Sequence, residues 1–114
     1  MFSVDYRLAP QNPYPIPIND CYQAYVWIIT QAKEFLGLDI EHVIVGGDSA
    51  GGHIATAISL LAAARGFRLP DTIVPIYPVF SIDISTFYPS LLLSIDEEIL
   101  SQHALNFFLK CFKG

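Results

Sequence analysis

The sequence predicts an α/β fold in which parallel strands are connected by helices. Short runs of β-branched residues alternate with longer segments of helical periodicity, and a glycine-rich turn joins one such run directly to a helix. We expect strands at about 2–6, 42–46 and 73–77, and helices at about 20–36, 50–65 and 95–112. We see neither an internal repeat nor a boundary between domains.

The first strand is expected to end in the proline-rich loop from Pro10 to Pro17, because proline lacks the amide that a strand requires. Asn19 or Asp20 can then cap the first helix. Apolar residues follow at helical spacing, and Gly37 stands where a left-handed C-cap residue is expected. This helix should pack one face on the sheet.

The second strand leads into the glycine-rich turn, and the helix after it is rich in alanine and should stop at Gly66. The third strand contains Pro75, which should lie at its end, at a bulge or where its amide is not needed. A loop is expected over 79–90, and Ser94 with Glu97 matches a capping box for the last helix.

Composition argues against several classes of protein. Hydrophobic residues make up 53% and charged residues 15%, against about 45–50% and 25% in typical domains. Some apolar surface should therefore pack against segments outside the chain. The formal charge of -5, with no basic cluster, argues against nucleic-acid binding. The longest apolar stretch, Ile54 to Ala64, would span only about 16 Å as a helix, so no transmembrane segment is expected.

Two further features favour a cytoplasmic protein. Asp5 and Arg7 come too early for the apolar core of a secretory signal peptide. Cys21 and Cys111 lie far apart without metal-ligand spacing, which favours two reduced thiols over a disulfide.

The glycine-rich turn carries the main functional signal. Ser49 lies at its apex between Gly47 and Gly51, in the pattern G-x-S-x-G. This pattern is typical of a nucleophile elbow, in which a strained turn raises the serine hydroxyl out of the sheet and glycines without Cβ let the chain approach itself closely. The amide of Ala50 would then face a developing oxyanion.

Several ordered motifs resemble the hormone-sensitive lipase family of α/β-hydrolases. They are the run Ser3 to Pro10 (SVDYRLAP), Pro13 to Pro15 and Asn19 to Cys21, the elbow Gly47 to Gly52 (GDSAGG), Leu69 to Asp71 with Ile76 to Pro78, and the segment Pro89 to Ser94.

The resemblance implies a serine carboxylic-ester hydrolase or lipase that acts on a small-molecule or lipid ester through an acyl-enzyme, without a metal or organic cofactor. In that reading Ser49 is the nucleophile, the Ala50 amide binds the oxyanion, and Gly47, Asp48, Gly51 and Gly52 form the elbow. It also implies that residues 1–114 are the central part of an incomplete α/β-hydrolase domain, because the family's upstream HGG loop and its downstream aspartate and histidine have no match here. We therefore expect the chain to be inactive alone.

The titratable residues after the elbow offer poor catalytic partners; they are His53, Asp71, Asp83, Asp96, Glu97, Glu98 and His103. The elbow directs Ser49 away from the helix that holds His53, so we expect an ordinary hydrogen-bonded or partly exposed histidine there. Asp96 and His103 belong to the last helix rather than to loops at the carboxyl ends of strands. Asp48 should brace the turn rather than titrate.

Two other functions stay open at this point. A ligand-binding receptor without catalysis, similar to the gibberellin receptors, keeps the same serine. A truncated remnant would do nothing alone.

The family's strand order makes a structural prediction. The strand leading to the HGG loop lies between the first strand of this chain and the elbow strand. Phe2 to Tyr6 should therefore either pair directly with Val43 to Val45 or lie beside a gap, whereas Val43 to Val45 should pair in parallel with Ile73 to Tyr77. The aromatic residues Tyr6, Tyr22, Tyr25, Trp27 and Tyr77 are expected in the core, and Asp5 and Arg7 should anchor neighbouring loops.

Overall fold

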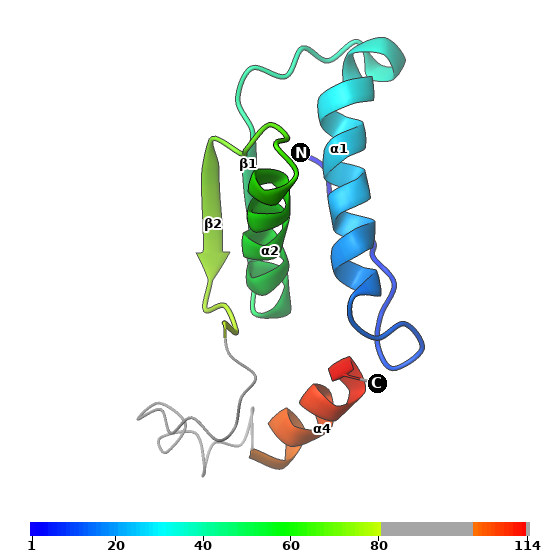
Figure 1. The fold of residues 1–114 in the computed structure, drawn as a ribbon, viewed down its shortest axis with the longest axis vertical. Coiled ribbons are helices and arrows are strands. Elements are labelled where there is room, and N and C mark those ends of the chain that lie inside the picture. The colour runs from blue at the N-terminus through cyan, green and yellow to red at the C-terminus, as the bar shows by residue number, and fades with distance from the viewer. Residues whose placement is uncertain (81–101, 114) are drawn as a thin grey trace.

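The computed structural model describes residues 1–80 and 102–113 and confirms the α/β class. In chain order the elements are α1 (Ile16–Leu36), β1 (Ile44–Asp48), α2 (Ala50–Ala64), β2 (Thr72–Ile76) and α4 (Gln102–Lys113) (Figure 1). The predicted end of the last helix lies within one residue of the end of α4. Its predicted start, its capping box and most of the loop expected over 79–90 lie outside the described residues.

The two strands pair in parallel, as predicted, with Ile44 opposite Thr72 and Asp48 opposite Ile76. The amide of Ser49 donates to the carbonyl of Ile76 at 2.9 Å. Because backbone groups of successive strand residues point to opposite sides, the backbone of Pro75 faces the outer edge of β2. Proline is thus tolerated inside the strand because no described strand lies on that edge to accept from an amide at this position, which is one of the predicted outcomes.

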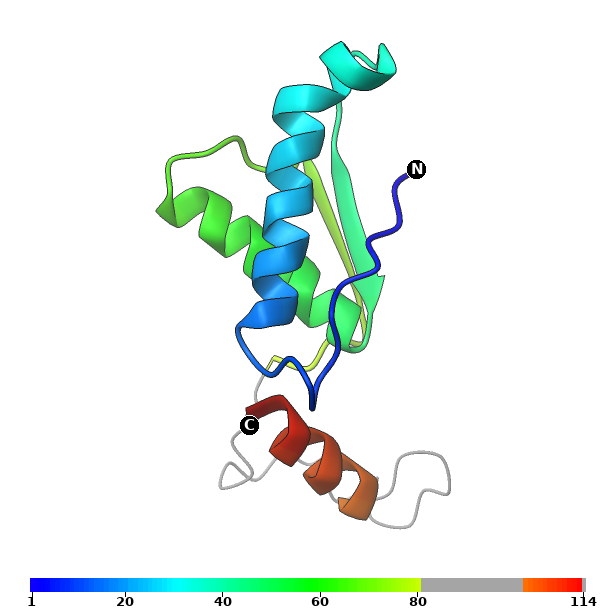
Figure 2. The ribbon, with the colours of Figure 1, turned by 90° about the vertical axis from the view of Figure 1, so that its right-hand side faces the viewer.

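The predicted strand over 2–6 is wrong, because this segment joins no ladder in the described part of the chain. It runs beside β1 without pairing to it (Figure 2). A cavity of about 870 Å³, here called the slot, lies between the segment and β1. The side chains are suited to a strand, but no described strand pairs with the backbone groups of this segment. The alternative prediction, a segment lying beside a gap, is confirmed.

Helix α1 begins at Ile16, about four residues before the predicted start, and its N-cap is Pro15 without a capping side chain. Pro17 is accepted in the first turn because amides there have no partner within the helix. Neither predicted cap residue therefore acts as one. At the other end, Gly37 takes the predicted left-handed C-cap conformation with φ 67° and ψ 18°.

The carboxylate of Asp20 instead binds Arg7 through two contacts, Nε to Oδ2 at 2.9 Å and Nη2 to Oδ1 at 2.6 Å. The Arg7 amide also donates to this carboxylate at 3.2 Å. Arg7 was expected to anchor a neighbouring loop by hydrogen bonds; it does form them, but its partner lies in a helix, so it fastens the end of the N-terminal segment to the first turns of α1.

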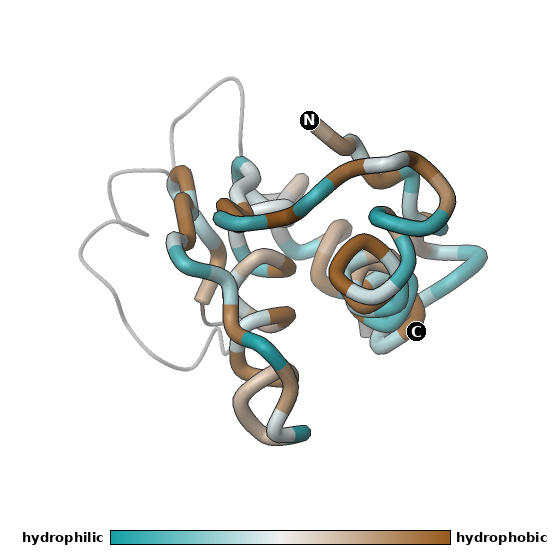
Figure 3. Tube along the Cα trace, turned by 90° about the horizontal axis from the view of Figure 1, so that it is seen from above, coloured by the Kyte–Doolittle hydropathy of each residue, from teal (hydrophilic) through white to brown (hydrophobic). Residues whose placement is uncertain are grey.

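Helix α2 packs on both strands (Figure 1). Helix α1 was expected to pack on the sheet, but it packs on α2 instead. The buried cluster joins the two helices; its members are Ile18, Cys21, Tyr22, Tyr25, Ile54, Ile58 and Ala62. Val43 and Val45 pack against this cluster from the strand side. Hydrophobic residues also continue along the N-terminal segment (Figure 3).

Much apolar surface stays open, as the composition predicted. Every residue of β2 is exposed, and Ile44 of β1 is 67% exposed. Tyr22 and Tyr25 are buried in the core as expected, but Trp27 and Tyr77 are exposed, which corrects their predicted placement. Both cysteines are free, as predicted. Among the described residues, no helix is long and apolar enough to cross a membrane.

Candidate active site at the strand–helix turn

Ser49 lies between the end of β1 and the first residue of α2, in the sharp turn that the sequence predicts. Its backbone has φ 50° and ψ -114°, a sparsely populated conformation for a residue with a Cβ. Two hydrogen bonds maintain it: the Ser49 amide donates to Ile76, and the amide of His53 donates to the Ser49 carbonyl at 3.1 Å. The serine side chain is left exposed at the carboxyl end of the sheet.

The glycines around Ser49 differ in how much space they have. A Cβ on Gly47 would lie 2.6 Å from the carbonyl carbon of Gly51, a distance that real Cβ atoms do not show. A Cβ on Gly52 would lie 3.0 Å from the Gly47 oxygen, whereas one on Gly51 would meet nothing within 4 Å. The prediction that missing Cβ atoms allow close approach therefore holds for Gly47 and is wrong for Gly51.

The amide of Ala50 is the first of α2, so it has no acceptor within the helix. No described residue outside the helix accepts from it either. A helix N-terminus favours negative charge because its free amides and the helix dipole point toward that end. The turn therefore places a hydroxyl and a free amide donor on neighbouring residues.

Asp48 does not brace the turn as expected. Its carboxylate is exposed and makes no hydrogen bond with a described residue. It acts at longer range on Tyr6, whose pKa is raised first by burial and then by the negative charges of Cys21 and Asp48.

No hydrogen bond joins the ring of a described histidine to Ser49. His53 Nδ1 lies 2.8 Å from the carbonyl oxygen of Val79, and its ring meets the edge of Phe112 at 6.2 Å. This agrees with the expected ordinary helix histidine. The backbone of Phe112 accepts from the Tyr14 amide at 2.9 Å, so the end of α4 is attached to the loop before α1, while its ring contacts His53 in the first turn of α2. The side chain of His103 lies outside the described part.

Asp71 lies just before β2, at the opposite end of the sheet from Ser49. Its Oδ2 accepts from the Val43 amide at 2.7 Å, and this bond is the main reason that the pKa of Asp71 is lowered, with Arg68 adding to it. Asp71 fixes the start of β1 and is too far along the strand to orient a catalytic group. Asp83, Asp96, Glu97 and Glu98 lie outside the described residues.

Tyr77 was not predicted to be special, yet it has φ 37° at the end of β2 beside the turn. No pattern in the sequence indicates this conformation, because tyrosine rarely adopts it. The chain therefore turns sharply after both strands, at the same end of the sheet. In the described ranges, no three histidine, cysteine or acidic residues are grouped closely enough to hold a metal ion.

The slot reaches the elbow along the other side of β1. It is lined by the N-terminal segment, by 42–51 and by residues of both helices, including Cys21. Burial raises the pKa of the Cys21 thiol to about 11, with Asp20 contributing less. The amides of Val45, Gly47 and Ser49 point toward β2, so those of the residues between them face the slot; these are the amides of Ile44, Gly46 and Asp48.

This geometry agrees with the comparisons to known proteins. A family model for the alpha/beta hydrolase fold matches residues 1–112. Hormone-sensitive lipase of Mus musculus is 39% identical over 114 residues, covering 100% of this chain. The chain belongs to the hormone-sensitive lipase family of α/β-hydrolases.

The similarity extends to microbial esterases and to solved structures. Carboxylesterase NlhH of Mycobacterium tuberculosis is 39% identical over 109 residues, or 94% of this chain. The hyperthermophilic esterase of Pyrobaculum calidifontis superimposes with a TM-score of 0.89 at 32% identity over 96% of this chain. The chain spans 15% of the mouse lipase, 33% of NlhH and 36% of the Pyrobaculum esterase.

Proposed function

We propose that this chain is the nucleophile-bearing part of a serine carboxylic-ester hydrolase. The observation that carries the proposal is the backbone of Ser49, an exposed residue held at φ 50° and ψ -114° between β1 and α2. A turn this strained persists only where its surroundings impose it, and such turns concentrate at functional sites. The esterases and lipases to which the chain is similar support the same chemistry.

In the proposed mechanism Ser49 attacks the carbonyl carbon of a small-molecule or lipid ester. The carbonyl oxygen becomes an oxyanion, which the Ala50 amide binds at the N-terminus of α2. Collapse of this intermediate expels the alcohol and leaves an acyl-Ser49, which water then hydrolyses to a carboxylic acid and free serine. No step requires a metal or organic cofactor.

The serine must also lose its proton, and no described side chain is hydrogen-bonded to its hydroxyl. His53 is bound to Val79, and Asp71 lies at the far end of the sheet. We therefore propose that the base, the acid that orients it and further oxyanion donors come from segments of the parent protein outside these residues.

A fluorophosphonate probe on the full-length parent tests the proposal, because such probes label only an activated serine. We expect mass spectrometry to locate the label on Ser49 and Ser49→Ala to abolish both labelling and hydrolysis of a short p-nitrophenyl ester. The matched control is Ser59→Ala, at a hydroxyl bound to the Ala55 carbonyl inside α2, which should keep both. Labelling that persists in Ser49→Ala would contradict the assignment.

The 114-residue chain alone should hydrolyse the same ester no faster than its Ser49→Ala variant. Turnover that depends on Ser49 in this chain would mean that one of its own histidines acts as the base. Binding of an ester analogue without labelling or turnover in the full-length parent would favour a non-catalytic receptor instead.

A further inference from the structure

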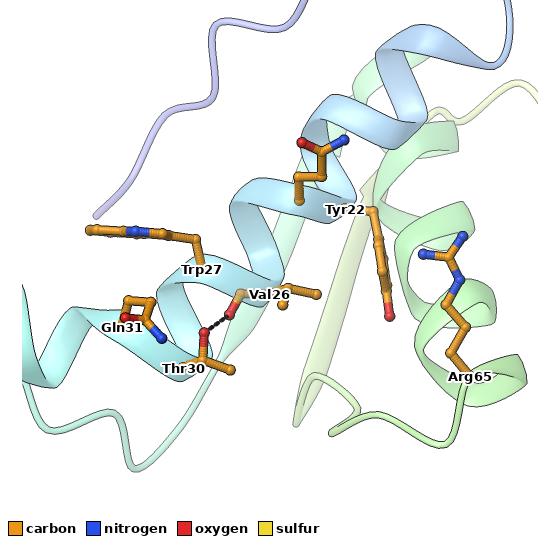
Figure 4. A pocket seen from close by; sticks show the side chains of 7 residues that line it. Tyr22, Val26, Trp27, Thr30, Gln31 and Arg65 are labelled. Atoms are coloured by element: carbon orange, nitrogen blue, oxygen red, sulfur yellow. Dashed lines mark hydrogen bonds between the residues drawn. The ribbon is translucent and has the colours of Figure 1, made fainter.

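A second hollow lies on the outer surface of the two helices, away from the elbow. This groove has a volume of about 350 Å³. It is lined by Tyr22, Gln23, Val26, Trp27, Thr30 and Gln31 of α1 and by Arg65 after α2 (Figure 4). Helix α2 has 15 residues, so the groove and Ser49 are separated by about 22 Å along its axis.

The floor of the groove is apolar and aromatic. Tyr22 is buried and half-buried Val26 packs against the core cluster, so both are held in place. Trp27 is 41% exposed, and its indole ring lies beside the Phe35 ring, with the two centroids 6.2 Å apart. The Thr30 hydroxyl is already used, because it donates to the Val26 carbonyl at 2.8 Å. This floor suits the apolar body of a small molecule.

Arg65 adds a positive charge at the rim. Its guanidinium carbon lies 4.5 Å from the centroid of the Tyr22 ring (Figure 4). Such stacking fixes the guanidinium while leaving its N–H groups free. Arg7, Lys33 and Arg68 each pair with an aspartate, whereas Arg65 has no acidic partner among the described residues.

We propose that this groove binds a small monocarboxylate with an apolar or aromatic body. The guanidinium of Arg65 offers two parallel donors that match a carboxylate. The body lies on Tyr22, Val26 and Trp27, and the amides of Gln23 and Gln31 are further donors at the rim. The volume of about 350 Å³ falls at the lower end of ligand sites, which limits the ligand to a small one.

A carboxylic acid is also the acyl product of ester hydrolysis, so the groove would let product bind at a distance from Ser49. That connection rests on the proposed function. Binding of the carboxylate to the groove does not rest on it, because this binding is measured without turnover. A failure of the groove proposal can therefore be distinguished from a failure of the proposed function.

Trp27 is the only tryptophan of the chain, so its fluorescence reports directly on the groove. Phenylacetate is the probe, and neutral phenylacetamide of nearly the same shape is its control. We expect a saturable change in Trp27 emission with phenylacetate and an affinity weaker by about fivefold for phenylacetamide, as an exposed charge-assisted contact would give.

Arg65→Gln should weaken phenylacetate by about the same factor and leave phenylacetamide unchanged. Lys110→Gln removes a charge from exposed α4 and should change neither titration. Far-UV circular dichroism checks that each variant keeps the fold. If Arg65→Gln does not fold, Arg65→Lys, which keeps the charge, replaces it in both titrations. The absence of a saturable change, or equal affinities for the acid and the amide, would overturn the proposal.

Discussion

The elbow and the N-terminal segment have equally clear sequence signals, yet only the elbow has the predicted structure. Around Ser49 the strand, the turn and the helix are adjacent in the chain, and β2 supplies hydrogen bonds to β1 within the described residues. Phe2 to Tyr6 has the residues of a strand but faces the slot instead of a neighbouring backbone. A turn and the helix after it depend mainly on local sequence, whereas a strand exists only when a partner is within reach.

The largest effect is expected from the glycine that the elbow requires. Gly47→Ala would place a Cβ 2.6 Å from the backbone of Gly51, so we expect a loss of about 3 kcal/mol or more in the free energy of unfolding. Gly51→Ala is the matched control, because its Cβ meets nothing within 4 Å. Its stability should stay within about 0.5 kcal/mol of the parent chain. Urea unfolding measures both, and equal losses would contradict the described turn.

The second-largest difference is expected between a core residue of α2 and an apolar residue of the N-terminal segment beside the slot. Ile58 is 5% exposed and belongs to the buried cluster, so Ile58→Ala should cost about 2–4 kcal/mol. Val4 is 38% exposed and lines the slot, so Val4→Ala should cost less than about 1 kcal/mol. A comparable loss for both would show that the N-terminal segment is part of the core.

A smaller effect is expected from Cys21, which lies between the core and the slot. Its pKa is raised from 9.0 to about 11 in the folded chain. The unfolded thiol therefore ionises first, and the contribution to stability that is present below pH 9 is lost as the pH rises toward 11. Unfolding measured across this range should show a shallower slope in Cys21→Ala.

The slope that remains in Cys21→Ala should come from Tyr6 and Tyr25, whose pKa values are also raised mainly by burial. Cys111→Ala removes the less buried thiol and is the matched control; it should keep the slope of the parent chain. An unchanged slope in Cys21→Ala would mean that this thiol is not desolvated.

The sequence predicted those features that depend on neighbours in the chain. The elbow, the end of α1 at Gly37 and the constraint on Pro75 follow from local chemistry, whereas the parallel pairing of the two strands was predicted from the strand order of the family that the sequence resembles. The start of α1 was misplaced because Asn19 and Asp20 are good capping residues, but Asp20 is recruited by Arg7, 13 residues away. The exposure of Trp27 and the φ of Tyr77 depend on tertiary packing, which periodicity does not reveal.

Residue-resolved hydrogen exchange of the 114-residue chain tests most directly whether the elbow half folds while the N-terminal segment stays unpaired. The amides of Val45, Gly47 and Ser49 point to β2 and should exchange slowly, whereas those of Ile44, Gly46 and Asp48 face the slot and should exchange fast. Amides of Phe2 to Tyr6 should also exchange fast. Equal, slow exchange in all three groups would show a paired N-terminal strand and would contradict this account.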